Sequence, residues 1–532
     1  MHPVKLRLAR AASTLALLVA GVPVACIAPQ RDAGTVVMAS GADLQSANPL
    51  VTVHPLARQV QRYALFVTLL RYDSLLAPVP YFARRWEWSS DRRVLRLHLA
   101  PDLSWSDGTR TTAHDVAFTL LAARDPRTGY PRASELSALD TALALDDTTA
   151  ELRYGGAQAS VPPILMELAI VPEHSLRAVP RSDLRTAAFN DAPIGNGPFR
   201  YVSRQRGARW TFARNDAFPA SLGGPPKLEG FVVSVVDEAT TKFAGLTSGE
   251  LDVAGISPTM AHLAERDRTL RLLTYPVMFS SAICFNTTRP PFDDARVRRA
   301  VSRAIDRKRI VDIALDGYGH PSSSPVPPEN AFASEIVVKP DTVLADSLLD
   351  AAGWRRGSNG VRTRGGRTLH VELLTVGTGD NIAEQLIQSD LAARGIELVI
   401  RQTELGSFLA AAHGNPRTFD MLLAGIPGDL ALSYVGALFS SAQKGGALDY
   451  TGFHSVALDT LLARAQAASI GAERRAAWLD VQGTIDSLAP AAWIYHSRGV
   501  QGISRRVGGV RMDLRGELVT LHDWTLAAPP GR

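Results

Sequence analysis

Cysteine is nearly absent from this chain of 532 residues, which has only Cys26 and Cys284. Two cysteines so far apart have none of the spacings that bind zinc, so the sequence predicts no metal site built on cysteine. Cys284 stands in the apolar run 281–285 and is expected to be a small core residue. We expect no disulfide between the two cysteines, because Cys26 lies at the end of a flexible leader.

Long apolar runs are absent after residue 26, so the sequence predicts no membrane-spanning helix, which needs ~20 apolar residues. The uncharged run 11–25 is shorter than that and follows three basic residues, Lys5, Arg7 and Arg10. A positive start before a short apolar segment is typical of a secretory signal. We therefore expect residues 1–26 to be a signal peptide and the mature protein to be soluble and extracytoplasmic.

Cys26 follows the apolar run directly, after Pro23, Val24 and Ala25. This arrangement resembles a bacterial lipoprotein signal, in which the cysteine becomes the lipidated first residue, although Pro23 stands where that pattern has leucine. Ordinary cleavage nearby is the alternative. Lipidation of Cys26 predicts a protein anchored to a membrane surface, in the periplasm or at the outer face of the cytoplasmic membrane.

Concentrated charge of one sign is missing as well. The formal net charge is only +5, and the arginines are scattered along the chain rather than gathered into runs. Proteins that bind nucleic acids usually concentrate basic residues on a patch or an arm, so we expect no nucleic-acid partner.

Catalytic and cofactor-binding signatures are missing too. The chain contains no nucleophile elbow, His-Glu-x-x-His motif, phosphate loop or dinucleotide fingerprint in the context that each requires. Its twelve histidines are dispersed and form no metal-ligand spacing. We therefore expect no enzymatic activity, no cofactor and no metal. A secreted enzyme and a structural envelope protein are the alternatives from other classes.

What the chain does contain is the pattern of a large α/β protein. Apolar residues make up 46% of it and charged residues 20%, which is typical of a folded protein. The length is too great for one core and predicts two or more lobes. Strands are expected over 94–99, where apolar and polar residues alternate, and over 231–236 and 369–374.

Helix starts are marked by capping residues. Thr112 with Asp115 three residues later is close to a capping box, which predicts a helix beginning there. Asp293 and Asp294 can cap the helix expected after Pro291. Such a mixture of helices and strands along the whole chain predicts several α/β lobes.

Short motifs then follow one another in a fixed order from about residue 46 to about residue 523. They are Asn48-Pro49-Leu50, Trp105-Ser106-Asp107-Gly108-Thr109, Thr112-Ala113-His114-Asp115-Val116, Gly195-Asn196-Gly197-Pro198-Phe199, Ser248-Gly249-Glu250-Leu251-Asp252, Phe285-Asn286-Thr287, Ala351-Ala352-Gly353-Trp354 and Phe419-Asp420-Met421. This succession resembles family 5, the peptide and nickel type, of extracellular solute-binding proteins, which serve ATP-binding-cassette (ABC) importers. The oligopeptide- and dipeptide-binding proteins belong to that group.

The resemblance implies an α/β fold of the two-lobed periplasmic-binding-protein type with an extra smaller subdomain (cluster C) and a ligand cleft between the lobes. It implies lobe I over 31–73, 193–284 and 494–528, an accessory subdomain over 74–192 packed on lobe I, and lobe II over 285–493. The implied function is capture of a small solute, above all a peptide, for an ABC permease, by a monomer. A non-peptide ligand, such as a metal chelate or an oligosaccharide, is the alternative within the family.

The resemblance also suggests ligand-binding residues on one strand and the loop after it. Asp429 occupies the position of the carboxylate that binds the peptide amine in peptide-binding members, and a buried amine needs such a partner. Gly425 and Ile426 precede it; Ile426 stands where those members have tryptophan, and Leu430 where they have tyrosine. The alternative for Asp429 is a loop residue or a helix cap.

Tyr434 and Asn286 are further candidates for ligand contact on the same grounds. Both could equally be structural polar residues whose hydrogen bonds stay within the protein. No arginine can be singled out as the partner of a ligand carboxylate; Arg401 and Arg417 are both open.

Overall fold

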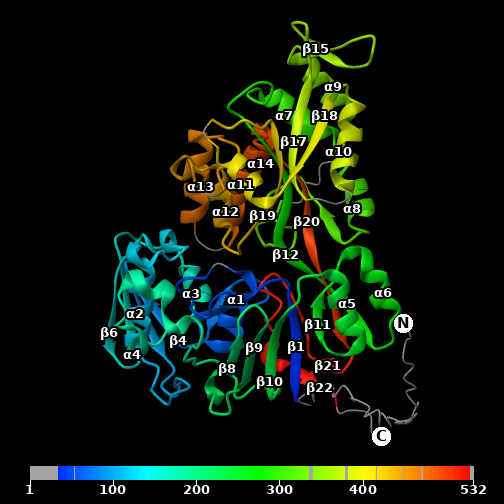
Figure 1. Ribbon diagram of the computed structural model, residues 1–532. Coiled ribbons are helices and arrows are strands. Elements are labelled where there is room, and N and C mark those ends of the chain that lie inside the picture. The colour runs from blue at the N-terminus through cyan, green and yellow to red at the C-terminus, as the bar shows by residue number, and fades with distance from the viewer. Residues whose placement is uncertain are drawn as a thin grey trace, which may run out of the picture.

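The computed structural model describes residues 34–527 except 53, 335–338, 378–380, 415, 447 and 469–470. The expected signal peptide and Cys26 therefore lie outside the described residues. Figure 1 shows two bodies, one above the other, with the strands β12 (Leu270–Phe285) and β20 (Ala491–Ser504) running from one into the other. We call residues 34–276 and 498–527 the lower body and residues 280–496 the upper body.

The sheet of the lower body is built from segments far apart in the chain. Its strands run in the order β11-β1-β10-β9-β8. Strand β1 is parallel to β10, whereas β10 with β9 and β9 with β8 form antiparallel pairs. Their bounds are β1 Thr35–Ser40, β8 Phe199–Gln205, β9 Arg209–Arg214, β10 Gly230–Val235 and β11 Val253–Gly255. Helices α5 (Ala239–Ser248) and α6 (Ala261–Arg266) belong to the same body, as do α1 (Pro55–Val60) and the short strands β2 (Leu70–Tyr72), β3 (Pro78–Pro80), β21 (Val507–Gly508) and β22 (Thr525–Leu526).

A second, antiparallel sheet lies at one side of the lower body, in the order β4-β5-β7-β6. Its strands are β4 Ala83–Trp88, β5 Val94–Leu99, β6 Leu139–Asp146 and β7 Thr149–Tyr154, with helices α2 (Ala113–Arg124), α3 (Ile164–Glu167) and α4 (Glu173–Leu176). Its buried side chains share one continuous core with those of the lower-body sheet. The prediction of a strand over 94–99 is confirmed.

The capping box before α2 is also confirmed. The Asp115 carboxylate accepts a hydrogen bond from the Thr112 backbone N–H at 2.8 Å, and the Thr112 hydroxyl accepts one from the His114 N–H. This reciprocal pairing satisfies N–H groups that the first turn of a helix leaves free.

The upper body has its own strands and two cores of buried side chains. Strands β17 (His370–Val376), β18 (Glu397–Thr403) and β19 (Met421–Pro427) continue the sheet in the order β18-β17-β19-β12, and β13 (Gly319–Pro321) pairs with β20. A small hairpin sheet comprises β14 Arg355–Arg356, β15 Arg362–Arg364 and β16 Arg367–Thr368. The helices are α7 Ala295–Ala304, α8 Arg307–Ala314, α9 Thr342–Ala351, α10 Ile382–Ala392, α11 Leu405–Ala412, α12 Ser433–Phe439, α13 Val456–Ala467 and α14 Ala472–Leu488.

Two sequence predictions for the upper body are confirmed. Helix α7 follows Pro291, and Asp294 caps it by accepting a hydrogen bond from the Arg296 N–H at 2.9 Å. Cys284 is a core residue of the upper body, and burial raises the pKa of its thiol to about 12. The α/β fold class is likewise confirmed.

The passage between the two bodies lies within β12 and β20. Residues 270–276 of β12 pair with 498–504 of β20, the register shifts between Pro276 and Ser280, and β12 then pairs with 491–496. Tyr275 belongs to the lower core and Ala282 to an upper one, so the change of core coincides with the shift of register. The lobe boundaries expected from the sequence stay a prediction. The boundaries expected after residues 284 and 493 lie within the upper body, a few residues beyond this shift of register.

None of the helices within the described part of the chain has the length and apolar character needed to cross a membrane.

Candidate functional site

Five charged side chains from three separate segments meet on the lower body. Arg58 lies on α1, and Arg62 on the single π-helical turn that continues α1 over Gln61–Leu65. Arg132 and Glu135 lie at the 3-10 turn Ala133–Leu136, and Glu167 is the last residue of α3. We call these five side chains the arginine–glutamate cluster.

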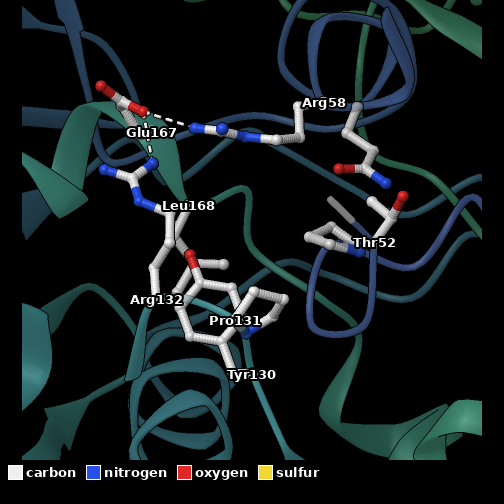
Figure 2. A pocket seen from close by; sticks show the side chains of 9 residues that line it. Thr52, Arg58, Tyr130, Pro131, Arg132, Glu167 and Leu168 are labelled. Carbon is white, nitrogen blue, oxygen red and sulfur yellow. Dashed lines mark hydrogen bonds and ion pairs between the residues drawn. The ribbon is translucent and has the colours of Figure 1, made fainter. Parts of the chain in front are cut away.

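All three arginines approach the same oxygen of Glu167. Arg58 Nη2 donates to Glu167 Oε2 at 2.7 Å, Arg132 Nη1 forms a short ion pair with it, and Arg62 Nη1 lies 3.9 Å away. Figure 2 shows the guanidinium groups of Arg58 and Arg132 converging on Glu167. Arg132 also donates from Nη2 to Glu135 Oε2 at 2.7 Å.

The Glu167 side chain is only 2% exposed, so the arginines, rather than water, stabilise its ionised form. Burial by itself raises the pKa of a carboxyl group, because it disfavours the charged form. At Glu167 the guanidinium groups of Arg132, Arg62 and Arg58 outweigh burial and lower the pKa to about 2. Glu167 is therefore ionised at neutral pH.

The cluster borders a pocket of about 60 Å³. Figure 2 shows the side chains that line it: Pro49, Thr52, Arg58, Gln61, Tyr130, Pro131, Arg132, Glu167 and Leu168. The wall is thus half apolar, with two guanidinium groups on one side. Ligand sites usually combine apolar walls with a few fixed polar groups, and the wall of this small pocket has that mixture.

On the upper body, Asp429 lies in the loop between β19 and α12. Its Oδ1 accepts a hydrogen bond from the Ser433 N–H at 3.1 Å, and its Oδ2 accepts from the Ser433 hydroxyl at 2.7 Å and from the Tyr434 N–H at 3.2 Å. Asp429 therefore caps the first turn of α12. A carboxylate offers about four acceptor positions, so one of them is left for a further donor.

Asp429 lies close enough to the lower body for its charge to act there. Desolvation and the Glu167 carboxylate raise the pKa of Tyr72 well above its ordinary value, and the Asp429 carboxylate adds to this rise. Desolvation also raises the pKa of Glu135, and the Glu167 and Asp429 carboxylates add to it there too, against the Arg132 charge. The charges of Glu167 and Asp429 thus both act on Tyr72 of β2.

One hydrogen bond joins the two bodies near this place. Arg474, on α14 of the upper body, donates from Nη2 to the Ser160 hydroxyl of the lower body at 3.3 Å. Desolvation lowers the pKa of Arg474. Figure 1 shows the α11–α14 side of the upper body above α1 and α3, so the two faces are opposed.

Gly425 and Ile426 lie on opposite faces of β19. Ile426 is buried in the upper core, whereas Gly425 is on the exposed face, where a Cβ would collide with the ring of Phe279. Tyr434 is buried, and its hydroxyl donates to the Pro325 carbonyl at 2.6 Å. The structure thus brings Asp429 and Tyr434 together. The ligand roles expected for Gly425, Ile426 and Tyr434 stay predictions, as does that of Asp429.

Asn286 lies elsewhere in the upper body and is fully buried. Its Nδ2 donates to the Phe419 carbonyl at 2.8 Å, and its Oδ1 accepts from the Thr288 hydroxyl at 2.6 Å. Of the two arginines left open, Arg401 pairs with Glu372 and Arg417 with Asp449. Each of these three side chains therefore has a partner within the protein, although Arg417 Nε is buried without a hydrogen-bond partner among the described residues.

Sequence reasoning missed the arginine–glutamate cluster. Its members come from segments up to about 110 positions apart, and no local motif marks them. One signal was present: Glu167 is a single acid in the otherwise apolar stretch 164–171, and a buried acid requires a partner. Among the described residues, no group of three or more His, Cys, Asp and Glu side chains could hold a metal ion.

Comparisons with known proteins agree with this architecture. The model of the family described as bacterial extracellular solute-binding proteins, family 5, middle part, matches residues 77–446. The chain is 26% identical over 493 residues to the protein named Probable di/tripeptide-binding protein 5 of Pseudomonas aeruginosa, covering 87% of this chain and 90% of that protein.

Solved structures of two-lobed binding proteins have the same fold. NikZ of Campylobacter jejuni, in complex with Ni(L-His), matches with a TM-score of 0.79 at 21% identity over 93% of this chain and 100% of its own. The oligopeptide-binding protein AppA of Bacillus subtilis, in complex with a nonapeptide, matches with a TM-score of 0.76 at 22% identity over 93% and 99%. The two-lobed fold predicted from the sequence is confirmed.

Proposed function

The chain belongs to family 5 of the bacterial extracellular solute-binding proteins, and we propose from this premise that it captures a short peptide outside the cytoplasm and delivers it to the permease of an ABC importer. The similarity to a protein named as a di/tripeptide-binding protein, over most of both chains, supports a peptide as the ligand. The proposed activity is binding and release, without a catalysed reaction.

The observation that carries the peptide assignment is the setting of Asp429. Its carboxylate keeps one acceptor position free, and its charge acts on Tyr72 and Glu135 of the opposite body. A peptide amine between the two bodies would be desolvated and would need a fixed negative partner. Asp429 is proposed as that partner, which matches the role expected for its position.

Delivery to a permease requires that the bodies open and close around the ligand. Two-lobed proteins do this by hinge rotation at a few residues that absorb the change. The register shift between Pro276 and Ser280 is the proposed hinge, since β12 changes there from one core to the other. The hydrogen bond between Arg474 and Ser160 would then form only when the bodies approach.

Attachment and assembly are part of the proposal. We propose a lipid anchor on Cys26 and a monomeric protein held at the outer face of the cytoplasmic membrane or in the periplasm. Metabolic labelling with a fatty acid tests the anchor by comparing the wild type with Cys26→Ser. Label on the wild type alone is the expected result, and equal labelling of both would contradict it.

Peptide binding can be tested with the protein as purified from its host. Native mass spectrometry should show a co-purified peptide, and titration with mixtures of dipeptides and tripeptides should change the emission of the eight tryptophans and saturate. Failure of both peptide mixtures, with no peptide in the mass spectrum, would overturn the proposal. A co-purified mass containing a metal would point instead to a chelate.

A further inference from the structure

We propose that the small sheet of β14, β15 and β16 docks the protein onto an anionic phospholipid bilayer. We call residues 355–368, which contain these three strands, the basic hairpin. Figure 1 shows the basic hairpin at the end of the upper body that points away from the lower body. The inference is independent of the ligand, so its test is separate from that of the proposed peptide binding.

The first observation is the charge of this part of the chain. The stretch 351–371 contains no aspartate or glutamate, but it contains five arginines: Arg355, Arg356, Arg362, Arg364 and Arg367. Two carboxylates of α9, Asp346 and Asp350, form ion pairs with them. The net charge of the surface therefore depends on which arginines these two carboxylates neutralise.

The two carboxylates of α9 are engaged at close range by arginines other than the exposed ones. Arg362, whose side chain is 2% exposed, donates to Asp350 Oδ1 at 2.7 Å and to Asp346 Oδ1 at 2.8 Å. Arg394, which follows α10, donates to Asp346 Oδ2 at 2.6 Å. These two arginines thus balance the two carboxylates, and the other four arginines of the basic hairpin leave it with a net positive charge.

Arg355 and Arg356 form the exposed strand β14. Their guanidinium groups lie 3.9 and 3.7 Å from oxygens of the α9 carboxylates, which is farther than a hydrogen bond. Exposed ion pairs of this kind contribute little to stability. Both charges are therefore available to a partner outside the chain.

A two-residue turn places the other two exposed arginines opposite each other. Gly365 and Gly366 have φ of 58° and 76°, the left-handed conformation that such a tight hairpin turn requires. Across this turn Arg364 pairs with Arg367. Arg364 lies over the Trp354 ring at 4.7 Å, whereas Arg367 has no hydrogen bond or ion pair among the described residues. Like charges opposite each other in a sheet repel, and a bound anion would relieve this repulsion.

The composition of the surface favours lipid headgroups over a protein partner. None of the exposed large apolar side chains of the described chain lies within 351–371. The centre of a protein interface is usually apolar and aromatic, so this surface lacks what a stable protein contact needs. A layer of phosphate groups needs no such centre, and guanidinium groups bind phosphate through paired hydrogen bonds. Each arginine near an anionic bilayer strengthens binding about fivefold.

A bilayer is also the surface that the proposed anchor would supply. Cys26 lies nine positions before Thr35, where β1 begins, and nine residues span at most about 32 Å. The anchor would hold the lower body beside the membrane and raise the effective concentration of lipid at the basic hairpin, so that weak contacts suffice. With the hairpin at the far end of the upper body, the two contacts would lay the molecule along the membrane.

Binding to lipid vesicles tests the proposal. The protein is the whole mature chain from residue 26 onward, as Cys26→Ser, so that no anchor can hold it on a membrane. Cosedimentation measures its binding to vesicles of phosphatidylcholine alone and of an equal mixture with phosphatidylglycerol. We expect binding to the anionic vesicles only, and its loss at about 1 M salt, where charges are screened beyond ~3 Å.

Arg355→Gln combined with Arg367→Gln links this binding to the basic hairpin. Both side chains are exposed, so the double variant should fold, and thermal unfolding checks this. Loss of two arginines should weaken binding to the anionic vesicles about 25-fold. The matched control is Arg84→Gln combined with Arg85→Gln, because these two exposed arginines of β4 carry the same charge on the lower body. The control should bind like the wild type.

Three results would overturn the proposal. They are equal binding to neutral and anionic vesicles, no binding to either, and an equal loss in the test and control variants. Binding to membranes of the host but not to anionic vesicles, abolished by protease treatment of those membranes, would assign the hairpin to an acidic membrane protein instead. Titration with peptides by tryptophan emission should be the same in Arg355→Gln combined with Arg367→Gln as in the wild type, so failure of docking leaves the proposed function standing.

Discussion

Asp429 of the upper body and Glu167 of the lower body are two carboxylates near one tyrosine, but their surroundings differ. Asp429 accepts three hydrogen bonds from the first turn of α12 and has no arginine among these partners. Glu167 is buried among three arginines that all approach one of its oxygens, while the other oxygen has no hydrogen-bond partner within the described chain.

This difference separates a cap from a charge network. The hydrogen bonds of Asp429 are local and stabilise a helix end. The contacts of Glu167 join segments that are distant in sequence and hold the arginines beside the pocket. We infer that the loop around Asp429 is stable without the charge of that residue. The arginine–glutamate cluster of the lower body, in contrast, is stable only while its opposite charges pair with one another.

Glu167→Gln should have the largest effect on stability. It leaves Arg58, Arg62 and Arg132 with Glu135 as the one carboxylate of the cluster, and removal of one partner from a buried charge network costs about 3–5 kcal/mol. Urea unfolding measures the loss. The matched control is Glu151→Gln, a buried glutamate whose arginines, Arg96 and Arg153, are more than half exposed. Equal losses in both variants would show that the cluster is no more coupled than an ordinary ion pair.

Acid should weaken the cluster in a defined pH window. The pKa of Glu167 is about 2 in the folded protein against an ordinary value of 4.5, so its contribution is complete above pH 4.5 and is lost as the pH falls toward 2. The shift corresponds to about 3 kcal/mol of unfolding free energy. Unfolding free energies of the wild type and Glu167→Gln should therefore converge between these pH values. Parallel curves would contradict this assignment.

His496 should make the junction between the bodies sensitive to pH. Its Nδ1 lies 2.6 Å from the Ser280 hydroxyl, and burial, then the neighbouring His320, lower its pKa from 6.5 to about 3. As the pH falls, His496 takes up a proton in the unfolded chain before it does so in the folded protein. The contribution of neutral His496 to the free energy of unfolding is therefore complete above pH 6.5 and decreases below that pH. Between pH 6.5 and 5 the loss is about 2 kcal/mol. His496→Gln should lack this slope in urea unfolding; an unchanged slope would assign the pH dependence to other groups.

Asp429→Ala should have the smallest effect on the empty protein. Loss of a capping carboxylate costs about 1 kcal/mol, well below the loss expected for Glu167→Gln. Thermal or urea unfolding of the ligand-free variant measures this cost. A loss of several kcal/mol would show that Asp429 is mainly structural and would end the contrast between the two faces. Asp429→Asn, which keeps an acceptor, should lie between the variant and the wild type.

The sequence predicted the features that depend on neighbouring residues. The capping box of Thr112 and Asp115, the strand over 94–99 and the helix capped by Asp294 follow from patterns only a few residues long. The family and its two-lobed fold followed from the order of short motifs over the whole chain. Each of these motifs is mainly a turn, a cap or a strand end, so they specify the fold better than the ligand.

The candidate site was harder to predict, because its side chains meet only in the folded protein. Arg58, Arg132 and Glu167 come from separate segments whose convergence depends on the packing of the whole lower body. Gly425 and Ile426 show a different limit: neighbours on a strand point to opposite faces, so a pair taken together as ligand contacts includes one core residue. Asp429 was predicted as a ligand residue from its position, and its capping hydrogen bonds became known only from the structure.

The central claim is that Asp429 binds the amine of a peptide held between the two bodies. A crystal structure of the protein with a bound dipeptide or tripeptide tests this directly. We predict the ligand amine at about 2.7–3.2 Å from an Asp429 carboxylate oxygen. A bound peptide whose amine lies away from Asp429 would contradict the account.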